Sequence, residues 1–283
     1  MTVCCLPWAG IAGAAEPARV THDGRLKRDL RIVENGRAVV YAVVESQTMT
    51  SLMHVELPAG TPTRLHPMAA TSQIEAAFSP DGRFRAWVEF RGVTNVKLLL
   101  RDMLENREAL FDPGSDRAHL GSPTISPDGR RVVFSLPQPS GQQLVSIDTQ
   151  AGDRRNLTDT AGINDWPAFS PDGSQLAFGS SREGDFEIYL MAAGGGDARR
   201  LTHSPGLDLR PAWSPDGRRI AFTSLRDGNY ELYVVGVDGG RLTRLTDHAE
   251  RDDYAQWHPD GRQLAWIAER DGEFDVYLQR VAP

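Results

Sequence analysis

The stretch Phe169-Ser170-Pro171-Asp172-Gly173 decides the fold, because close copies of it recur along the chain. The copies are Phe78-Ser79-Pro80-Asp81-Gly82, Ile125-Ser126-Pro127-Asp128-Gly129, Trp213-Ser214-Pro215-Asp216-Gly217 and Trp257-His258-Pro259-Asp260-Gly261. Their prolines stand at positions 80, 127, 171, 215 and 259 and are therefore 47, 44, 44 and 44 residues apart. A period of this length indicates a repeat protein in which each unit is one supersecondary structure.

Each repeat alternates strand signals with turn signals. Proline presets φ for a turn and glycine accepts a positive φ, so Pro-Asp-Gly between apolar runs predicts a hairpin. Period-two alternation in Arg219-Ile220-Ala221-Phe222-Thr223 and in Tyr230-Glu231-Leu232-Tyr233-Val234 predicts strands on either side of a second turn. A third turn at Asp238-Gly239-Gly240 leads to a fourth strand at Thr243-Arg244-Leu245-Thr246. Four antiparallel strands in each repeat are typical of a β-propeller blade.

The two ends of the chain complete each other. Asn35-Gly36 and the apolar run after it mark a weaker first repeat, which brings the number of repeats to six. The last repeat stops after its third strand, at 274–278. The missing fourth strand matches the N-terminal stretch Ala18-Arg19-Val20-Thr21-His22, which resembles Arg199-Arg200-Leu201-Thr202-His203. We therefore predict an all-β, six-bladed β-propeller of four-stranded antiparallel blades. Its N-terminal strand completes the last blade and closes the ring, so no strand edge stays unpaired.

The N-terminal residues predict the compartment. Residues 2–15 are uncharged and mostly apolar, and Ala12-Gly13-Ala14 offers a small-residue cleavage pattern without a basic region before it. We expect residues 1–16 to be an apolar tail or the remnant of a signal peptide, too short to span a bilayer. Residues 17–283 are expected to form a single propeller domain. The predicted location is periplasmic or secreted, with the cytoplasm as the alternative.

Charge and cysteine content narrow the classes of partner. The net charge of −7 and the pI near 5.5 argue against nucleic acid, which favours basic surfaces. The two cysteines, Cys4 and Cys5, precede the repeats and lack the spacing of a metal site. We expect a monomer without a membrane span.

The repeat resembles that of a known family. Pro211-Ala212-Trp213-Ser214-Pro215-Asp216-Gly217-Arg218-Arg219-Ile220-Ala221-Phe222, followed by Arg226-Asp227-Gly228-Asn229-Tyr230-Glu231-Leu232-Tyr233 and Arg244-Leu245-Thr246, is similar to the repeat of the TolB-type propeller family. This resemblance implies a propeller that is commonly bacterial, often exported, and binds other proteins. Similar repeats occur in the propeller of prolyl-oligopeptidase-like peptidases, but the Gly-x-Ser-x-Gly elbow of their hydrolase domain is absent from this sequence.

Acidic residues recur at the predicted entry to the innermost strands. Seven residues before the repeat prolines stand Asn164, Asp208 and Asp252, and Asp165 and Asp253 each follow directly. If these side chains point into the channel, their oxygens form a rim of the kind that Ca²⁺ requires, and Ca²⁺ is the one cofactor predicted. In the alternative interpretation, each side chain caps its own loop by bonding to nearby backbone N–H groups.

Arginines and aromatic residues supply the predicted ligand contacts. Arg182, Arg226 and Arg270 recur in the second hairpin loop, at constant spacing from Glu187, Glu231 and Asp275. They are expected either to pair with those acids across the hairpin or to contact a ligand. Trp166 and Tyr254 both stand five residues before a repeat proline, near the predicted channel mouth. They are expected to pack at the rim or to contact a ligand.

No sequence pattern nominates a nucleophile with its base. We therefore predict a non-catalytic scaffold that binds a protein or peptide through its loop face or channel mouth. One alternative is a propeller that binds Ca²⁺ or a small ligand at the acidic rim. The other is a hydrolase or lyase with a site at the channel mouth, built from residues of several blades. The step from fold to function is an association, because one fold supports many functions.

Overall fold

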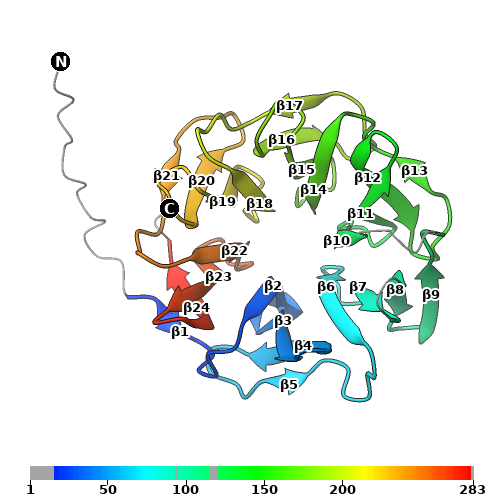
Figure 1. Cartoon of the computed structure of the whole chain (residues 1–283), viewed down its shortest axis with the longest axis horizontal. Helices are drawn as coiled ribbons and strands as arrows, with labels where there is room; N and C mark the ends of the chain where they lie inside the picture. The colour runs from blue at the N-terminus through cyan, green and yellow to red at the C-terminus, as the bar shows by residue number, and fades with distance from the viewer. Residues whose placement is uncertain (1–15, 93–94, 115–119, 282–283) are drawn as a thin grey trace.

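The structure is a computed structural model that describes residues 16–92, 95–114 and 120–281. Its strands form a ring of antiparallel sheets around a central axis, as in a β-propeller (Figure 1). The first 15 residues, which include Cys4, Cys5 and most of the predicted tail, lie outside the described residues. Among the described residues, no helix is long and apolar enough to cross a membrane.

Five repeats supply four strands each, and the last supplies three that β1 completes; in each set the strands are ordered from the axis outwards (Figure 1). The innermost strands are β2 (Lys27–Val33), β6 (Ser72–Phe78), β10 (Gly121–Ile125), β14 (Gly162–Phe169), β18 (Asp208–Trp213) and β22 (Asp252–Trp257). The second strands are β3 (Ala38–Ser46), β7 (Phe84–Phe90), β11 (Arg131–Gln138), β15 (Gln175–Ser180), β19 (Arg219–Ser224) and β23 (Gln263–Arg270). The third strands are β4 (Met49–Glu56), β8 (Val96–Asp102), β12 (Gly141–Asp148), β16 (Glu187–Ala192), β20 (Glu231–Gly236) and β24 (Glu273–Arg280). The outermost strands are β5 (Thr63–Arg64), β9 (Arg107–Phe111), β13 (Arg155–Asn156), β17 (Ala198–Arg200), β21 (Thr243–Arg244) and β1 (Ala18–Arg19), and η1 (Glu34–Gly36) is a single 3₁₀ turn.

The Ser-Pro-Asp-Gly turns join the first strand of a repeat to the second. In the turn after β14, the hydroxyl of Ser170 donates to Asp172 Oδ1 at 2.6 Å, and the Gly173 amide donates to the Ser170 carbonyl at 2.9 Å. Gly173 has a φ of 72°, which glycine adopts without steric cost. The same bonds recur in the turns that begin at Ser79, Ser126 and Ser214, so the repeated sequence builds a repeated turn.

The number of separate blades differs from the prediction. The structure has four separate four-stranded sheets, not six, and the strands of the two remaining repeats form one eight-stranded sheet. The link is a short parallel pairing of β12 with β14, at Gly141–Gly162 and Gln142–Ile163. The backbones meet there because both residues are glycines: a Cβ on Gly141 would lie 2.1 Å from the Gly162 carbonyl oxygen. The prediction of a six-bladed propeller is therefore wrong, while the all-β propeller is confirmed.

The N-terminal strand closes the ring, as predicted. β1 pairs antiparallel with β24, so that Ala18 lies opposite Leu278 and Arg19 opposite Tyr277. Beyond β1, the hydroxyl of Thr21 donates to Asp275 Oδ1 at 2.6 Å, and Arg19 also pairs with Asp275. The two ends of the chain are thus joined by a ladder and by a buried carboxylate.

Apolar residues pack between neighbouring repeats rather than within one. One core cluster joins Val39, Tyr41 and Val43 of the first repeat to Ala265 and Ile267 of the last. At another junction, Trp213 Nε1 donates to the Ala168 carbonyl of the preceding repeat at 3.0 Å. The packing leaves the innermost strands to line a central channel.

Candidate functional site

A bulge in every innermost strand aims one side chain into the channel. The strand register shifts at the same point in β2, β6, β10, β14, β18 and β22. At each shift one non-glycine residue has a φ between 52° and 59°, and these residues, which we call the channel ring, are Asp29, Glu75, Ser122, Trp166, Arg210 and Tyr254. A left-handed conformation at a non-glycine residue costs of order 1–3 kcal/mol and is a feature of functional sites. Bulges re-aim side chains in this way.

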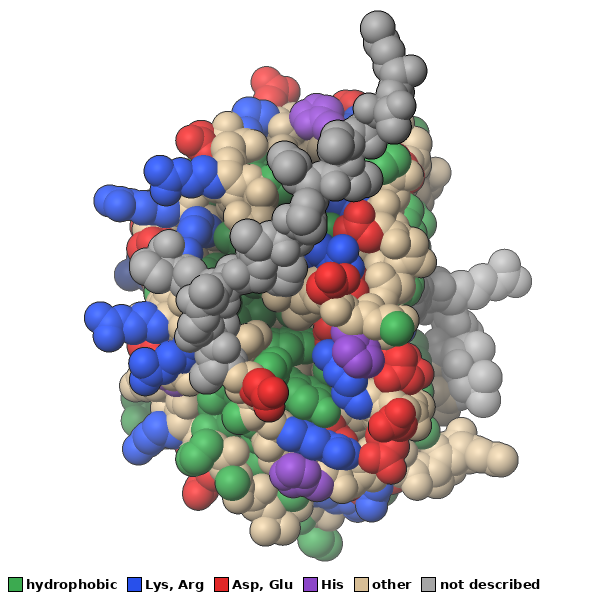
Figure 2. All heavy atoms as spheres, turned by 90° about the vertical axis from the view of Figure 1, so that its left-hand side faces the viewer, with side chains coloured by type: hydrophobic (Ala, Val, Ile, Leu, Met, Phe, Trp, Pro, Cys, Tyr) green, Lys and Arg blue, Asp and Glu red, His purple; other side chains and the backbone are tan. Residues whose placement is uncertain are grey.

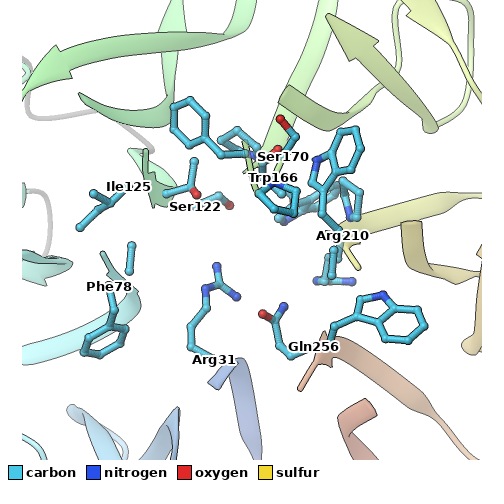
Figure 3. Close-up of a pocket in the computed structure, with 18 of the residues that line it drawn as sticks. Arg31, Phe78, Ser122, Ile125, Trp166, Ser170, Arg210 and Gln256 are labelled. Carbon is cyan, nitrogen blue, oxygen red and sulfur yellow. Dashed lines mark hydrogen bonds between the residues drawn. The ribbon is translucent and has the colours of Figure 1, made fainter. Parts of the chain in front are cut away.

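A pocket of about 420 Å³ extends from the channel ring to the Ser-Pro-Asp-Gly turns (Figure 3). Two residues beyond the ring, each innermost strand contributes a second layer, which comprises Arg31, Ala77, Thr124, Ala168, Ala212 and Gln256. Four of these side chains are small, so they leave the space that forms the pocket. Nearer the turns, the wall consists of Phe78, Phe169, Trp213, Trp257 and the turn prolines Pro80, Pro127, Pro171 and Pro215.

In one half of the channel ring, the side chain of Arg210 lies between the aromatic side chains of Trp166 and Tyr254. The Arg210 guanidinium lies 5.1 Å from the centre of the Trp166 ring and 4.4 Å from that of Tyr254. It also pairs with buried Asp253 at 3.2 Å, and its Nε has no hydrogen-bond partner among the described residues. Burial raises the pKa of Tyr254 to about 12, and the nearby Asp29 carboxylate adds to the rise. This half of the ring is a preformed aromatic wall.

The other half of the ring is acidic. Arg28 donates to Asp29 at 2.8 Å and to Glu75 at 3.3 Å, and the amide of Ser122 donates to Glu75 at 2.6 Å. Burial, together with the charges of Asp29 and Asp165, raises the pKa of Glu75 to about 8 against the opposing effects of Ser122 and Arg28. Glu75 is therefore protonated in a large fraction of molecules at neutral pH.

Arg31 is the cation of the second layer. Its Nη1 donates to the Leu30 carbonyl at 2.9 Å, and among the residues that the structure describes it forms no ion pair. Burial lowers its pKa, although the carboxylates of Asp29 and Glu75 oppose that shift. Figure 3 shows Arg31 and Gln256 pointing into the middle of the pocket.

The predicted acidic rim lies elsewhere. Asn164, Asp208 and Asp252 are fully buried within their own sheets rather than in the channel. Asp208 accepts from Ser224 at 2.6 Å and from Arg226 at 2.9 Å. Asp252 accepts from Trp266 and Arg270, and Asn164 accepts from Ser180 and Arg182. These residues neither line a channel rim nor accept from nearby backbone N–H groups, because their oxygens accept from arginine, hydroxyl and indole side chains. Asp252 Oδ2 has no hydrogen-bond partner among the described residues.

Asp165 and Asp253 stand beside the channel ring. Asp165 accepts from the Trp166 amide, and Asp253 binds Arg210, Arg251 and the hydroxyl of Thr223. In the described part of the chain, no three His, Cys, Asp or Glu side chains form a group that could hold a metal ion. Calcium binding stays an untested prediction.

The repeated arginines do not pair with the acids that the sequence predicted. Arg226 and Arg270 pair with Asp208 and Asp252, not with Glu231 and Asp275. The repeated acids instead bind the arginine that ends the fourth strand and the threonine two residues after it: Glu187 binds Arg200 and Thr202, and Glu231 binds Arg244 and Thr246. The repeated Arg-x-Thr pattern was the signal for this pairing. Arg182, Arg226 and Arg270 each bond to a residue of their own repeat and do not line the pocket. Their contact with a ligand stays an untested prediction.

The sequence identified part of the channel ring. Trp166 and Tyr254 line the pocket, as their position five residues before the proline predicted. Glu75, Ser122 and Arg210 share that position and were missed, because their side chains differ in type although their spacing is the same. Asp29 and Arg31 come from the first repeat, which has no Ser-Pro-Asp-Gly turn, so no spacing identified them.

Comparisons with known proteins give two family matches. Residues 39–205, more than half of the 283 residues, match the TolB beta propeller domain family. Residues 192–271 match the Tricorn protease N-terminal beta propeller domain family. A search of curated protein sequences gave no match.

Solved structures with a similar fold include TolB from Acinetobacter baumannii, with a TM-score of 0.70 and 21% identity. That similarity covers 86% of this chain and 64% of that one, so this chain spans less than two thirds of its length. A putative TolB from Agrobacterium tumefaciens has a TM-score of 0.69 and 20% identity, covering 92% of this chain and 91% of that one. An oligogalacturonate lyase in complex with manganese has a TM-score of 0.62 and 18% identity, covering 90% of this chain and 76% of that one. At these identities the likeness establishes the fold alone.

Proposed function

This chain belongs to the TolB β-propeller family, and from that premise we propose that it is a non-catalytic binding protein whose central channel takes up a segment of a protein partner. The observation that carries the proposal is the pocket between the channel ring and the Ser-Pro-Asp-Gly turns. It has the size of a ligand site, about 420 Å³, and the aromatic lining with a few convergent polar groups that such sites share.

The lining favours a peptide. Aromatic and arginine side chains are the residue types that dominate protein recognition, and the pocket offers Trp166, Tyr254, Arg31 and Arg210. The bulges that hold the ring residues are part of the folded strands, so the pocket is preorganised and binding orders few protein side chains. A protein-binding role also agrees with what the TolB-type resemblance implies.

The test is an array of heptapeptides tethered by their N-termini and made in two forms, with a free C-terminal carboxylate and with a C-terminal amide. Thr124→Trp, in the second layer, fills the pocket, while Gln150→Trp adds the same side chain on an exposed loop. We expect bound peptides to lose at least about tenfold in affinity for the Thr124→Trp variant only. Absence of binding in both forms, or equal binding to both variants, would overturn the proposal.

We also propose export to the periplasm, supported by the apolar N-terminal residues and by the family. Expression of the whole gene with fractionation of the host cells tests this. Recovery of the protein in the periplasmic fraction supports export, and recovery in the cytoplasm alone contradicts it.

A further inference from the structure

Two cations of the channel form ion pairs with described residues and the third does not. Arg28 is held between Asp29 and Glu75, and Arg210 is paired with Asp253. Arg31 forms no ion pair within the described residues, although it sits in the half-buried wall of the pocket. A guanidinium that lies in a confined site and forms no direct ion pair keeps hydrogen-bond donors for an anionic ligand, and its planar fork fits a carboxylate in particular.

The second layer is shaped around this cation. Ala77, Ala168 and Ala212 occupy three of the equivalent positions and leave free space opposite Arg31. Gln256 is the other long polar side chain of that layer, and its amide points into the same space (Figure 3). Its Nε2 donates one bond to the Ala255 carbonyl at 2.8 Å, which leaves the second amide hydrogen for a ligand. A carboxylate in the space would thus meet two donors.

The face on which the pocket opens carries a recurring arginine. The residue after the turn glycine is an arginine in most repeats, and Arg37, Arg130, Arg218 and Arg262 are exposed there. The turn aspartates Asp81, Asp128, Asp172, Asp216 and Asp260 are exposed on the same face. The opposite ends of the strands carry exposed acids, among them Glu183, Asp185, Asp227, Asp271 and Glu273. In the side view of Figure 2, positively charged side chains project mainly at one edge of the ring and negatively charged ones gather mainly at the other.

From these observations we propose that the channel captures the C-terminal carboxylate of a peptide chain, with Arg31 as the carboxylate-binding residue and Gln256 as a second donor. This inference rests on the proposed peptide-binding function and specifies its ligand. A pocket of about 420 Å³ enclosed by a ring of strands accommodates a few residues of one extended chain, so a chain end enters it more readily than a loop. The apolar wall of Phe78, Phe169, Trp213 and Trp257 would contact the residues before the terminus.

The experiment compares three versions of the tightest-binding array peptide by titration calorimetry: the free acid, the C-terminal amide, and an amide whose last residue is glutamate. We expect the free acid to bind at least about tenfold more tightly than both amides, as the loss of a charge-assisted hydrogen bond predicts. Arg31→Gln should abolish the preference, and Arg31→Lys should keep part of it. Arg85→Gln is the matched control, because Arg85 is also half-buried and without an ion pair in the described structure but lines a different groove.

The outcomes separate the two proposals. Binding of acid and amide with equal affinity, or a preference that persists in Arg31→Gln, overturns the inference and leaves peptide binding in place. A preference for the glutamate amide assigns the site to acidic side chains and also overturns the chain-end assignment. If no peptide in either form binds, peptide binding itself is wrong. Should Arg31→Gln fail to fold, the comparison of acid with amide on the unaltered protein still decides the question.

Discussion

Glu75 shows how a single residue of the channel ring links structure to pH. Its carboxyl group is buried, and its pKa is raised from 4.5 to about 8. The folded protein therefore keeps a proton that the unfolded chain releases between those two values. Because the folded state binds more protons in this window, the free energy of unfolding falls as pH rises through it and is level above and below it.

Replacing Glu75 with glutamine should remove this dependence. Glutamine has nearly the same shape, keeps an oxygen for the Ser122 amide, and does not ionise. The free energy of unfolding of Glu75→Gln should exceed that of the parent protein by about 1–3 kcal/mol near pH 9, with a smaller gain near pH 5. Urea denaturation across this range measures the difference. Glu56→Gln, at an exposed position, is the control, and an equal pH response of both variants would contradict the account.

The buried acid–arginine pairs offer a matched comparison within one molecule. Arg226 pairs with Asp208 and lies 4.5 Å from the Tyr233 ring centre, whereas Arg182 bonds to the neutral Asn164 and lies 4.7 Å from that of Tyr189. Arg226→Met should cost about 3–5 kcal/mol, because it leaves a buried carboxylate without its counter-charge. Arg182→Met should cost only about 1–3 kcal/mol, because it leaves a buried amide oxygen. Urea denaturation measures both, and equal losses would show that the charge of Asp208 is not what Arg226 satisfies.

At the scale of elements, the close approach of β12 and β14 depends on glycine. Gly141 and Gly184 have similar φ values, 131° and 127°, but a Cβ on Gly184 would meet nothing within 4 Å. Alanine at either position bears the same backbone strain, and only Gly141→Ala adds a clash with the Gly162 carbonyl. We expect Gly141→Ala to be less stable than Gly184→Ala by about 1–3 kcal/mol. Thermal melting of the two variants checks this, and identical melting would contradict the close approach.

The elements were more predictable from the sequence than their contacts. Turn chemistry and period-two alternation act locally, so the recurring Pro-Asp-Gly predicted the hairpins and the order of strands around the ring. The link at Gly141 and Gly162 was not predicted, since it depends on a close approach of two backbones that local sequence does not encode. The same limit applies to the channel. Trp166 and Tyr254 were recognised by their spacing from the repeat proline, whereas Arg31 was missed because its repeat has no Ser-Pro-Asp-Gly turn. Partners of Arg226 and Arg270 were misassigned because nearness in sequence was taken for nearness in space.

At the scale of the whole molecule, the ring is closed by residues from its two ends. Asp275 receives bonds from Arg19, Thr21 and Lys27, and Lys27 Nζ also donates to the Phe274 carbonyl at 2.8 Å. Removing residues 1–22 takes away β1 and two of these donors, which leaves β24 with an open edge and Asp275 with fewer partners. Such an edge promotes association between chains.

Two truncations test the closure. Deletion of residues 1–22 should lower the melting temperature markedly and cause aggregation, whereas deletion of 1–15 should leave the melting temperature almost unchanged, because β1 begins at Ala18. Thermal melting with light scattering measures both effects. Equal melting of the two truncations would mean that the N-terminal strand does not stabilise the ring.

The central claim is that a peptide binds in the channel from the face of the Ser-Pro-Asp-Gly turns. The most direct measurement is hydrogen–deuterium exchange of the unaltered protein with and without the tightest-binding peptide. We predict slower exchange at the turns 79–83, 126–130, 170–174 and 214–218, with no change at the hairpins 182–186 and 226–230 on the opposite face. Protection confined to those hairpins or to the outermost strands would contradict the claim.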